Sequence, residues 1–337
     1  MIRSAIDSVV SGKDLSRSEA AEALRVIMTG GATPAQTAAL IVGLRMKGET
    51  VDELTGFVEV MREHVTRVRC SAKDVLDTCG TGGDGLRTFN VSTCAAFIAA
   101  GAGIKVAKHG NRAMSSSCGS ADVLEALGVA ITVSAKQAET LLDEVGLAFL
   151  FVQAFHPSAR YVAPIRREIG TRTLFNLIGP LTNPAFANRQ VLGVPKPELT
   201  ETVGRICANL GMEHVWVVCG HPGMDELSTL GPNTVCEVRQ GSLRRFTLDP
   251  QSLGLERPPQ PAITGGTIEE NAQTLKNVLS GEPGPKRDIV LLNAAAALVV
   301  GGLAEDLPEG LAKAARVLDR GAAMACLETL AARNRPA

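Results

Sequence analysis

The sequence predicts an α/β protein in which a small helical domain precedes a larger α/β domain with a mostly parallel central sheet flanked by helices. Residues 1–68 carry helical patterning throughout, whereas from Val75 onward short apolar runs alternate with helices. That alternation is typical of a parallel sheet with helical crossovers. The 337 residues are enough for two domains. The break in composition near residue 70 is the best boundary, although a later segment could rejoin the first domain.

Three helices within the first 68 residues are expected to begin at a capping box, a Ser or Thr followed three positions later by Glu or Gln. The pairs are Ser16 with Glu19, Thr33 with Gln36, and Thr50 with Glu53. Gly30, Gly31 and Gly48 are expected to end the preceding helices. The helix at 33–47 is apolar on more than one face, so it is either deeply buried or part of an interface with a partner.

The larger domain is predicted element by element from short apolar runs and helical periods. The predicted strands are 75–80, 104–110, 147–152, 189–194 and 214–220. The predicted helices are 94–103, 121–129, 134–146, 197–210, 262–281, 285–303 and 308–331. The stretch 231–261 is predicted to be an antiparallel excursion with turns at Gly241 and Pro250.

The composition excludes several classes of protein. A formal net charge of −1 and few aromatic side chains (one Trp, one Tyr, nine Phe) argue against a general grip on nucleic acid or anionic lipid. The eight cysteines show no zinc or redox spacing, so we expect free thiols in a reducing cytosol. We see no signal peptide and no uninterrupted apolar run of about 18 residues, and therefore expect a cytoplasmic protein.

The first loop that carries chemistry is 77–93, DTCGTGGDGLRTFNVST. Its glycines match G-x-G-x-x-G, but no Asp or Glu lies between Asp84 and Asp122 to hold the ribose of a dinucleotide. Basic residues fill that window instead, which favours a phosphate cradle over a plain tight turn. Asn90, Ser92 and Thr93 stand at the start of the next helix, as caps or as ligands of the same anion.

The second loop, 108–122, follows the next predicted strand and should emerge at the same carboxyl edge of the sheet. It offers cationic and amide donors from Lys108, His109, Asn111 and Arg112. Gly110 and Gly119 flank a run of serines. We expect a hinge that closes over an anion rather than a simple surface turn.

Two further segments carry charged groups. Residues 163–184 hold three arginines, one of which could bind a small carboxylate bidentately. Asp225 and Glu226 are adjacent after a strand and a glycine turn. From the residues alone they are equally well explained as ligands of Mg²⁺ that also bridges substrate phosphates, or as acids at a helix N-terminus.

At these loops the sequence resembles the anthranilate phosphoribosyltransferase family of tryptophan biosynthesis, among the nucleoside phosphorylase-like phosphoribosyltransferases. The resemblance covers essentially the whole chain. It is carried by CGTGGDG, TFNVST, KHGNR, GSADVLEALG, GTRTLFNLIGPLTNPA, GMDELS and GPNTV, in the order and spacing of the family. It implies a Mg²⁺-dependent pentosyltransferase that moves 5-phosphoribosyl from phosphoribosyl pyrophosphate to the amine of anthranilate and releases pyrophosphate.

The resemblance also implies binding residues. Those for phosphoribosyl pyrophosphate are Gly80, Gly83, Asp84, Thr88, Asn90, Val91, Ser92, Thr93, Lys108, His109, Gly110, Asn111, Arg112, Ser115, Ser116 and Ser120. Those for anthranilate are Gly80, Asn111 and Arg166, with Arg166 engaging the carboxylate. Ser92, Asp225 and Glu226 would hold metal, with about two Mg²⁺ ions in all. No residue is assigned as catalytic acid, base or nucleophile.

The domains implied are a helical unit, 1–70, rejoined by about 163–185, and an α/β unit, 71–162 and 186–337, with the active site between them and a homodimer through the helical unit. The sequence departs from the family pattern at Ser117, Cys118, Phe155 and Ala159, near the hinge and the anthranilate entrance. The alternatives are a related transferase with another aromatic acceptor, a non-catalytic paralogue that binds nucleic acid, and a pyrimidine nucleoside phosphorylase.

Overall fold

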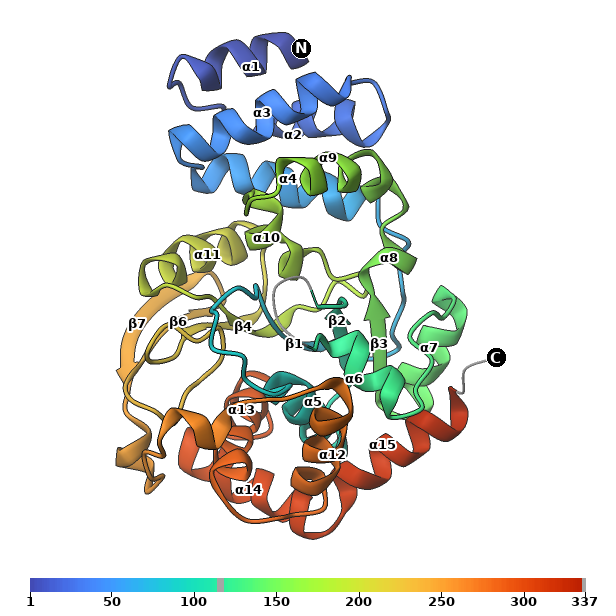
Figure 1. Ribbon diagram of the computed structural model, residues 1–337, viewed down its shortest axis with the longest axis vertical. Coiled ribbons are helices and arrows are strands. Elements are labelled where there is room, and N and C mark those ends of the chain that lie inside the picture. Colours follow the sequence, from blue (N-terminus) through green and yellow to red (C-terminus); the bar gives the residue numbers. More distant parts are fainter. Residues whose placement is uncertain (114–117, 335–337) are drawn as a thin grey trace.

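The structure, a computed structural model, describes residues 1–113 and 118–334. Its first four helices form the N-terminal end of the molecule (Figure 1): α1 (Ile2–Val10), α2 (Arg17–Met28), α3 (Pro34–Lys47) and α4 (Val51–Glu63). The last three begin at the predicted capping boxes. In each, the N-cap hydroxyl accepts from the backbone amide three residues later, and the Glu or Gln side chain at that position accepts from the N-cap amide. In α3, Leu40, Ile41 and Leu44 are buried, whereas Met46 is exposed.

A seven-stranded sheet forms the centre of the larger part, in the order β3-β2-β1-β4-β5-β6-β7. Neighbouring strands are parallel from β3 to β5, and β6 and β7 add an antiparallel hairpin at one edge. The strands are β1 (Leu76–Gly80), β2 (Val106–Gly110), β3 (Leu147–Phe151), β4 (Arg189–Gly193), β5 (His214–Cys219), β6 (Asn233–Arg239) and β7 (Ser242–Leu248). The predicted fold class is confirmed, including the antiparallel excursion.

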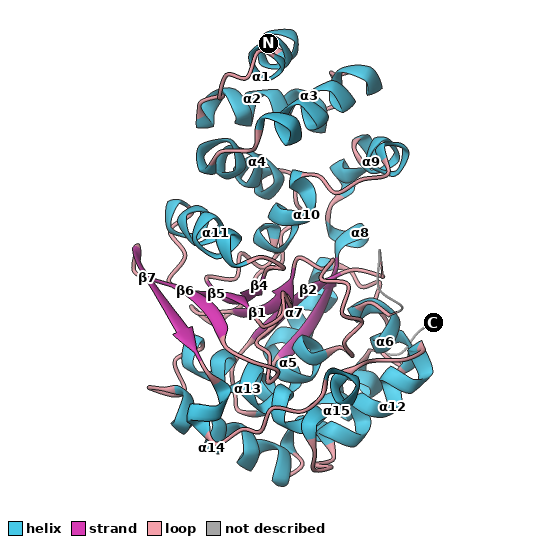
Figure 2. Ribbon diagram, turned by 60° about the vertical axis from the view of Figure 1, so that its left-hand side comes forward, coloured by secondary structure: helices cyan, strands magenta, loops and turns pink. Residues whose placement is uncertain are grey.

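Helices cover both faces of this sheet (Figure 2). α11 packs on β5 and β6 from the side of the N-terminal helices, while α5 and α13 pack on the strands from the opposite side. The helices of the larger part are α5 (Val91–Gly101), α6 (Ser120–Ala126), α7 (Ala135–Glu144), α8 (Val152–Phe155), α11 (Pro197–Asn209), α12 (Ile268–Leu279), α13 (Pro285–Val300), α14 (Leu307–Asp319) and α15 (Ala322–Arg333).

One helix prediction is wrong. The single helix expected over 308–331 is two helices, α14 and α15, because the chain turns at Gly321 with φ +71°. That left-handed conformation is open to glycine and strained for other residues, so a helix cannot continue through it.

The segment between β3 and β4 leaves the sheet and lies beside the N-terminal helices, which come much earlier in the sequence (Figure 1). It contains α9 (Ala163–Ile169) and α10 (Leu174–Ile178), with short 3₁₀ turns at Pro157–Tyr161 and Gly179–Thr182. α9 packs against α3, and α10 packs against α4. A hydrophobic core runs without a break from this bundle to the buried side chains of β4, β5 and α11.

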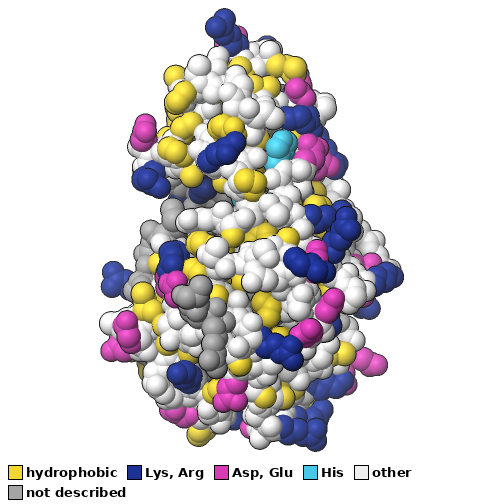
Figure 3. Space-filling model, turned by 90° about the vertical axis from the view of Figure 1, so that its right-hand side faces the viewer, with side chains coloured by type: hydrophobic (Ala, Val, Ile, Leu, Met, Phe, Trp, Pro, Cys, Tyr) yellow, Lys and Arg dark blue, Asp and Glu magenta, His cyan; other side chains and the backbone are white. Residues whose placement is uncertain are grey.

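Among the described residues, no helix is long and apolar enough to cross a membrane. On the face drawn in Figure 3, Lys and Arg side chains alternate with Asp and Glu. This distribution of both signs agrees with the near-zero net charge of the sequence.

Candidate active site

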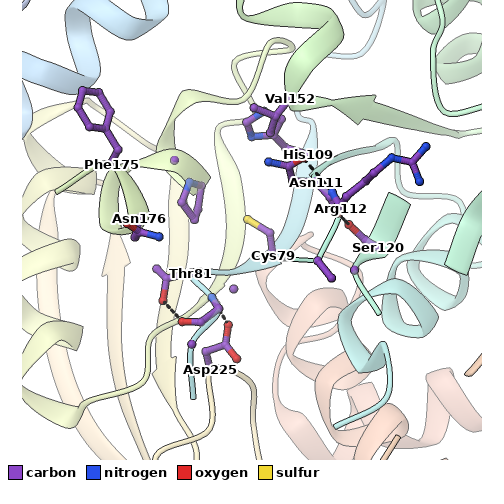
Figure 4. Close-up of a pocket in the computed structure, with 18 of the residues that line it drawn as sticks. Cys79, Thr81, His109, Asn111, Arg112, Ser120, Val152, Phe175, Asn176 and Asp225 are labelled. Carbon is purple, nitrogen blue, oxygen red and sulfur yellow. Dashed lines mark hydrogen bonds between the residues drawn. The ribbon is translucent and has the colours of Figure 1, made fainter. Parts of the chain in front are cut away.

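A cavity of about 380 Å³ opens between the carboxyl ends of the parallel strands and the α9–α10 segment. In Figure 4, Phe175 and Asn176 lie on one side of it, His109, Asn111, Arg112 and Ser120 on the other, and Asp225 below Thr81. The strand order reverses between β1 and β4, and open parallel sheets bind ligands at such a switch point. All four loops that the sequence analysis singled out contribute to its lining.

The loop after β1 is shaped by glycines. Gly82, Gly83 and Gly85 have φ of +69°, +79° and +73°, a region that only glycine enters without strain. The amide of Gly82 donates to Asp225 Oδ2 over 2.7 Å. The loop therefore already holds a carboxylate oxygen with a backbone N–H, which is what a cradle for phosphate oxygens does.

Two paired glycines let the acidic loop approach the sheet. Gly80 of β1 lies opposite Gly193 of β4 in the register of the parallel pair. A Cβ on Gly80 would meet Asp225 Oδ2 at 1.9 Å, and one on Gly193 would meet the Asp225 carbonyl oxygen at 1.4 Å. Any side chain at either position would push Asp225 out of the switch point.

Asp225 and Glu226 lie in a loop, not at the start of a helix. This excludes the helix N-terminus as their explanation. Glu226 Oε1 accepts from the Ser92 amide over 2.9 Å, while Glu226 Oε2 and Asp84 Oδ2 are buried without a hydrogen-bond partner. Carboxylate oxygens are the ligands that Mg²⁺ prefers, so these unpartnered oxygens fit a divalent cation.

Burial is the main cause of a high pKa for both acids. Together with the charge of Asp84 on Asp225, and the charges of Asp225 and Asp84 on Glu226, burial raises the pKa of Asp225 to about 7 and that of Glu226 to about 8. Within residues 1–113 and 118–334, no three His, Cys, Asp or Glu side chains form a metal site by themselves. A cation here would need further oxygens, such as those of a bound phosphate.

The start of α5 is not a simple N-cap. Asn90 is the N-cap residue, but its side chain makes no capping bond. Its side-chain amide instead donates from Nδ2 to the Cys118 carbonyl over 3.3 Å. Thr93 Oγ1 is buried without a partner. Asn90, Ser92 and Thr93 line the cavity, whereas Val91 is completely buried and is not part of the lining.

Lys108 is the buried cation at the end of β2. Its ammonium donates to the Thr78 carbonyl and, over 3.4 Å, to Ser92 Oγ. Burial lowers its pKa, although the Asp77 and Glu226 carboxylates oppose this. Asp77 is also buried and accepts from the His109 amide, which fixes the end of β2 against β1.

The rest of the second loop divides into lining and supporting groups. His109, Gly110, Asn111 and Ser120 line the cavity. Arg112 also lines it, but its guanidinium donates to Asp122 and Glu125 of α6. Ser115 and Ser116 lie outside the described residues, as does Ser117.

Of the arginines in 163–184, the structure brings two to the cavity. Arg166 lies with its Cζ 5.3 Å from the centre of the Phe175 ring and donates to Asn176 Oδ1 over 3.3 Å. Burial lowers its pKa. Arg167, next to it on α9, is exposed and does not line the cavity.

Arg172 is the cation that the sequence analysis did not assign. It donates to the Gly82 carbonyl over 2.8 Å, and a Cβ on Gly83 would meet its Nη1 at 1.1 Å. A contact between residues about 90 positions apart leaves no local pattern in the sequence. The nearest signal is the count of three arginines in one short segment.

The end of the cavity near the helical bundle is apolar. Met28, Met61, Val162 and Ala163 line it, together with Phe175. Met28 and Met61 come from α2 and α4 and were not predicted as site residues.

The residues that depart from the family pattern do not all line the cavity. Ala159 and Cys118 line the cavity. Phe155 does not; it is buried in the core, and the neighbouring His156 faces the cavity instead. The departure at Phe155 therefore lies in the core and not in the lining of the cavity.

Comparisons with known proteins agree with this geometry. The families described as "Glycosyl transferase family, helical bundle domain" and "Glycosyl transferase family, a/b domain" match residues 3–65 and 72–324. The anthranilate phosphoribosyltransferase of Pelotomaculum thermopropionicum is 54% identical over 330 residues, 98% of this chain and 96% of that protein. The loop motifs are thus part of a likeness that extends over nearly the full length of both chains.

Solved structures give the same answer in three dimensions. The anthranilate phosphoribosyltransferase of Thermus thermophilus matches with a TM-score of 0.93 at 43% identity, covering 98% of this chain and 99% of that one. The enzyme of Saccharomyces cerevisiae in complex with PRPP and Mg matches with a TM-score of 0.89 at 29% identity, covering 98% and 97%. The resemblance predicted from the loops is confirmed.

Proposed function

The chain belongs to the anthranilate phosphoribosyltransferase family, and from that membership we propose that it transfers 5-phosphoribosyl from phosphoribosyl pyrophosphate to the amine of anthranilate. The products are N-(5-phosphoribosyl)anthranilate and pyrophosphate, and the reaction belongs to tryptophan biosynthesis. The chain is a pentosyltransferase among the glycosyltransferases. The comparisons do not favour another aromatic acceptor or a nucleic-acid-binding role.

The observation that carries this proposal is the polarity of the cavity described above. One end presents backbone amides, Lys108 and the acidic pair, which suits a phosphorylated sugar with its metal. The other end presents Arg166 beside Phe175 and two methionines, which suits a flat apolar ring with one carboxylate. The acceptor amine and ribose C1 would meet between the two ends.

We assign the phosphoribosyl pyrophosphate site to described residues of the cavity lining. They are Gly80, Gly83, Asp84, Thr88, Asn90, Ser92, Thr93, Lys108, His109, Gly110, Asn111, Arg112 and Ser120. Val91 remains a candidate only through its backbone, because its side chain is buried. Arg166, Asn111 and Gly80 are assigned to anthranilate.

Mg²⁺ fits the acidic end. Asp225 and Glu226 would hold one ion and Ser92 another, about two in all, with substrate oxygens completing the coordination. When bound, the metal would neutralise charge on the leaving pyrophosphate. The protein itself would hold the pyrophosphate with loop amides and Lys108.

The chain's own contribution to the chemistry is positioning and charge stabilisation. The C1–O bond to pyrophosphate breaks early and leaves oxocarbenium-like charge on the ribose. Arg166 would hold the anthranilate carboxylate so that the amine lies in line behind C1. The glycine loop and Lys108 would stabilise the charge that develops on the leaving group.

We propose further that two chains form a homodimer through the helical unit. Val10 and Met46, on α1 and α3, are 70% and 83% exposed, and hydrophobic side chains gather over this end of the molecule in Figure 3. We keep the division into a helical unit of 1–70 with about 163–185 and an α/β unit of 71–162 with 186–337. All eight cysteines lie in the described ranges and are free, which supports a reducing, cytoplasmic location.

The test is the loss of anthranilate fluorescence when purified protein is mixed with anthranilate, phosphoribosyl pyrophosphate and Mg²⁺. We expect a decay that requires all three components. Reactions lacking one component are the controls. Folded protein that leaves anthranilate unchanged would reject this function, and substituted aromatic amines would then be tried as acceptors.

A further inference from the structure

Two histidines from different elements meet at the wall of the cavity. His109 lies at the end of β2, and His156 follows α8. Their Nε2 atoms are 3.2 Å apart, and the rings are tilted by 39° with centroids 5.2 Å apart. Each residue is only 4% exposed, and both line the cavity. This contact is a hydrogen bond, so one ring must donate and the other accept.

The surroundings of His156 decide which ring donates. The Thr182 backbone lies beside the His156 ring and opposes the lowering of its pKa, as a carbonyl near a ring N–H does. Because Nε2 of His156 faces His109, we assign the His156 proton to Nδ1, on the side of the Thr182 backbone. A neutral imidazole carries one proton, so Nε2 of His156 is the acceptor and Nε2–H of His109 is the donor.

The same logic fixes the other nitrogen of His109. With its proton on Nε2, Nδ1 of His109 has an open lone pair. Among the described residues nothing pairs with Nδ1, and it is not one of the buried atoms that lack a partner. It is therefore left to face the cavity, on the same wall as Asn111 (Figure 4).

We propose that Nδ1 of His109 accepts a proton from the amine of anthranilate, and that His156 is a positioning residue that holds His109 in the required tautomer. This inference rests on the proposed function, and adds to it a proton acceptor that the sequence analysis left unassigned. As the amine nitrogen bonds to ribose C1, the C1–O pair leaves with pyrophosphate. The N–H proton goes to Nδ1, and His109 becomes an imidazolium that still donates from Nε2 to His156.

The chemistry needs only a weak base at this place. The nitrogen of an aromatic amine becomes strongly acidic once it bonds to C1, so even an imidazole of low basicity can take its proton. Burial and the neighbouring His156 and Lys108 charges hold the pKa of His109 well below its usual value. Both rings are therefore neutral at pH 7, and Nδ1 of His109 can accept a proton.

The first test is independent of activity. The chain has five histidines, so the ring nitrogens of ¹⁵N-histidine-labelled protein can be assigned by NMR with single variants. We expect His109 to be protonated at Nε2 and His156 at Nδ1 at pH 7. In His156→Gln the amide oxygen can still accept from His109, so the tautomer should persist; in His156→Leu it should become mixed. A His109 protonated at Nδ1 in the wild-type protein would overturn the inference.

The second test separates positioning from folding by kinetics. His109→Ala should lower kcat by roughly 10²-fold, the lower end of what a positioned proton acceptor contributes, and this loss should come on top of any change in KM for phosphoribosyl pyrophosphate, whose site His109 also lines. His156→Leu should lower kcat in the same direction, and His156→Gln should recover most of it. Equal kcat for all four proteins would reject the proton-acceptor role. A wild-type protein without transfer would instead reject the proposed function itself, whatever the tautomer.

Discussion

The carboxylate of Asp225 accepts a hydrogen bond from the backbone amide of Gly82, with 2.7 Å between Oδ2 and nitrogen. The acidic loop after β5 is thereby tied to the glycine loop after β1, across the point where the strand order reverses. The same carboxylate is proposed to bind metal and the same amide to bind phosphate. A phosphate oxygen that binds this amide must therefore replace a bond that the free protein already makes.

Asp225→Asn is expected to separate charge from geometry at this bond. The amide oxygen can still accept from Gly82, so the loop should keep its position while a metal ligand loses its charge. We expect the Mg²⁺ concentration for half-maximal rate to rise by about tenfold, which corresponds to about 1.4 kcal/mol. Asp225→Ala, which also loses the Gly82 bond, should raise KM for phosphoribosyl pyrophosphate as well. A magnesium titration that does not shift would reject the metal assignment.

Arg172 and Arg167 form a matched pair for testing the cation that sequence analysis did not assign. Both are exposed arginines of the α9–α10 segment, but only Arg172 contacts the glycine loop and lines the cavity. Arg172→Ala should raise KM for phosphoribosyl pyrophosphate by about tenfold, as expected for a lost bond of a charged donor. Arg167→Ala should match the wild-type protein. Equal effects of the two substitutions would contradict a specific role for Arg172.

Arg166→Ala is expected to act on the other substrate. Removing a half-buried guanidinium that pairs with a carboxylate typically costs about 2 kcal/mol or more, so KM for anthranilate should rise by about 30-fold or more. KM for phosphoribosyl pyrophosphate should change little, because Arg166 lies at the apolar end of the cavity. Steady-state kinetics with each substrate varied in turn measures both. Parallel losses for the two substrates would show that Arg166 does not hold the carboxylate.

Low pH is expected to destabilise the free protein through His156. Burial lowers its pKa from 6.5 to about 4, so the unfolded chain binds a proton more readily than the folded one. The contribution of His156 to the free energy of unfolding is present in full above pH 6.5. It is lost as the pH falls from there through the folded-state pKa of about 4, and the total loss is about 3 kcal/mol. His156→Gln does not titrate, so its free energy of unfolding should decline less between about pH 7 and pH 4.5. Denaturant unfolding at both pH values gives the comparison, and identical declines would exclude His156 as a source.

Two capping boxes with the same sequence signature should differ in stability. Glu53 is fully buried and accepts from the amides of Leu15 and Thr50 and from Lys47 Nζ, whereas Gln36 is only half-buried and accepts from the Thr33 amide alone. Glu53→Ala should cost about 3 kcal/mol, the loss typical of breaking a buried ion pair. Gln36→Ala should cost about 1 kcal/mol or less. Urea unfolding of the two variants would show equal losses if burial did not matter.

Most of the fold could be predicted from the sequence, because its signals are local. Capping boxes need only four residues, and a buried strand needs only a short apolar run before a glycine loop. The one wrong helix prediction, over 308–331, arose because small apolar residues continue on both sides of Gly321 and hide the turn there. The phosphate loops were found for the same reason, since their glycines, cations and hydroxyls are contiguous in sequence.

The rest of the site was decided by tertiary structure. Arg172 contacts Gly82, and His156 contacts His109 across 47 positions of the sequence. Met28 and Met61 reach the cavity from the helical bundle. None of these contacts follows a periodic pattern in the sequence. Glu53 and Gln36 have the same place in the same motif, and their different burial depends on which segments fold over them. The sequence by itself determined the elements, the order of the loops and the chemistry that each loop carries. Only the packing of distant segments decided which charges are buried together, because burial and pairing depend on neighbours that the chain brings close only when it folds.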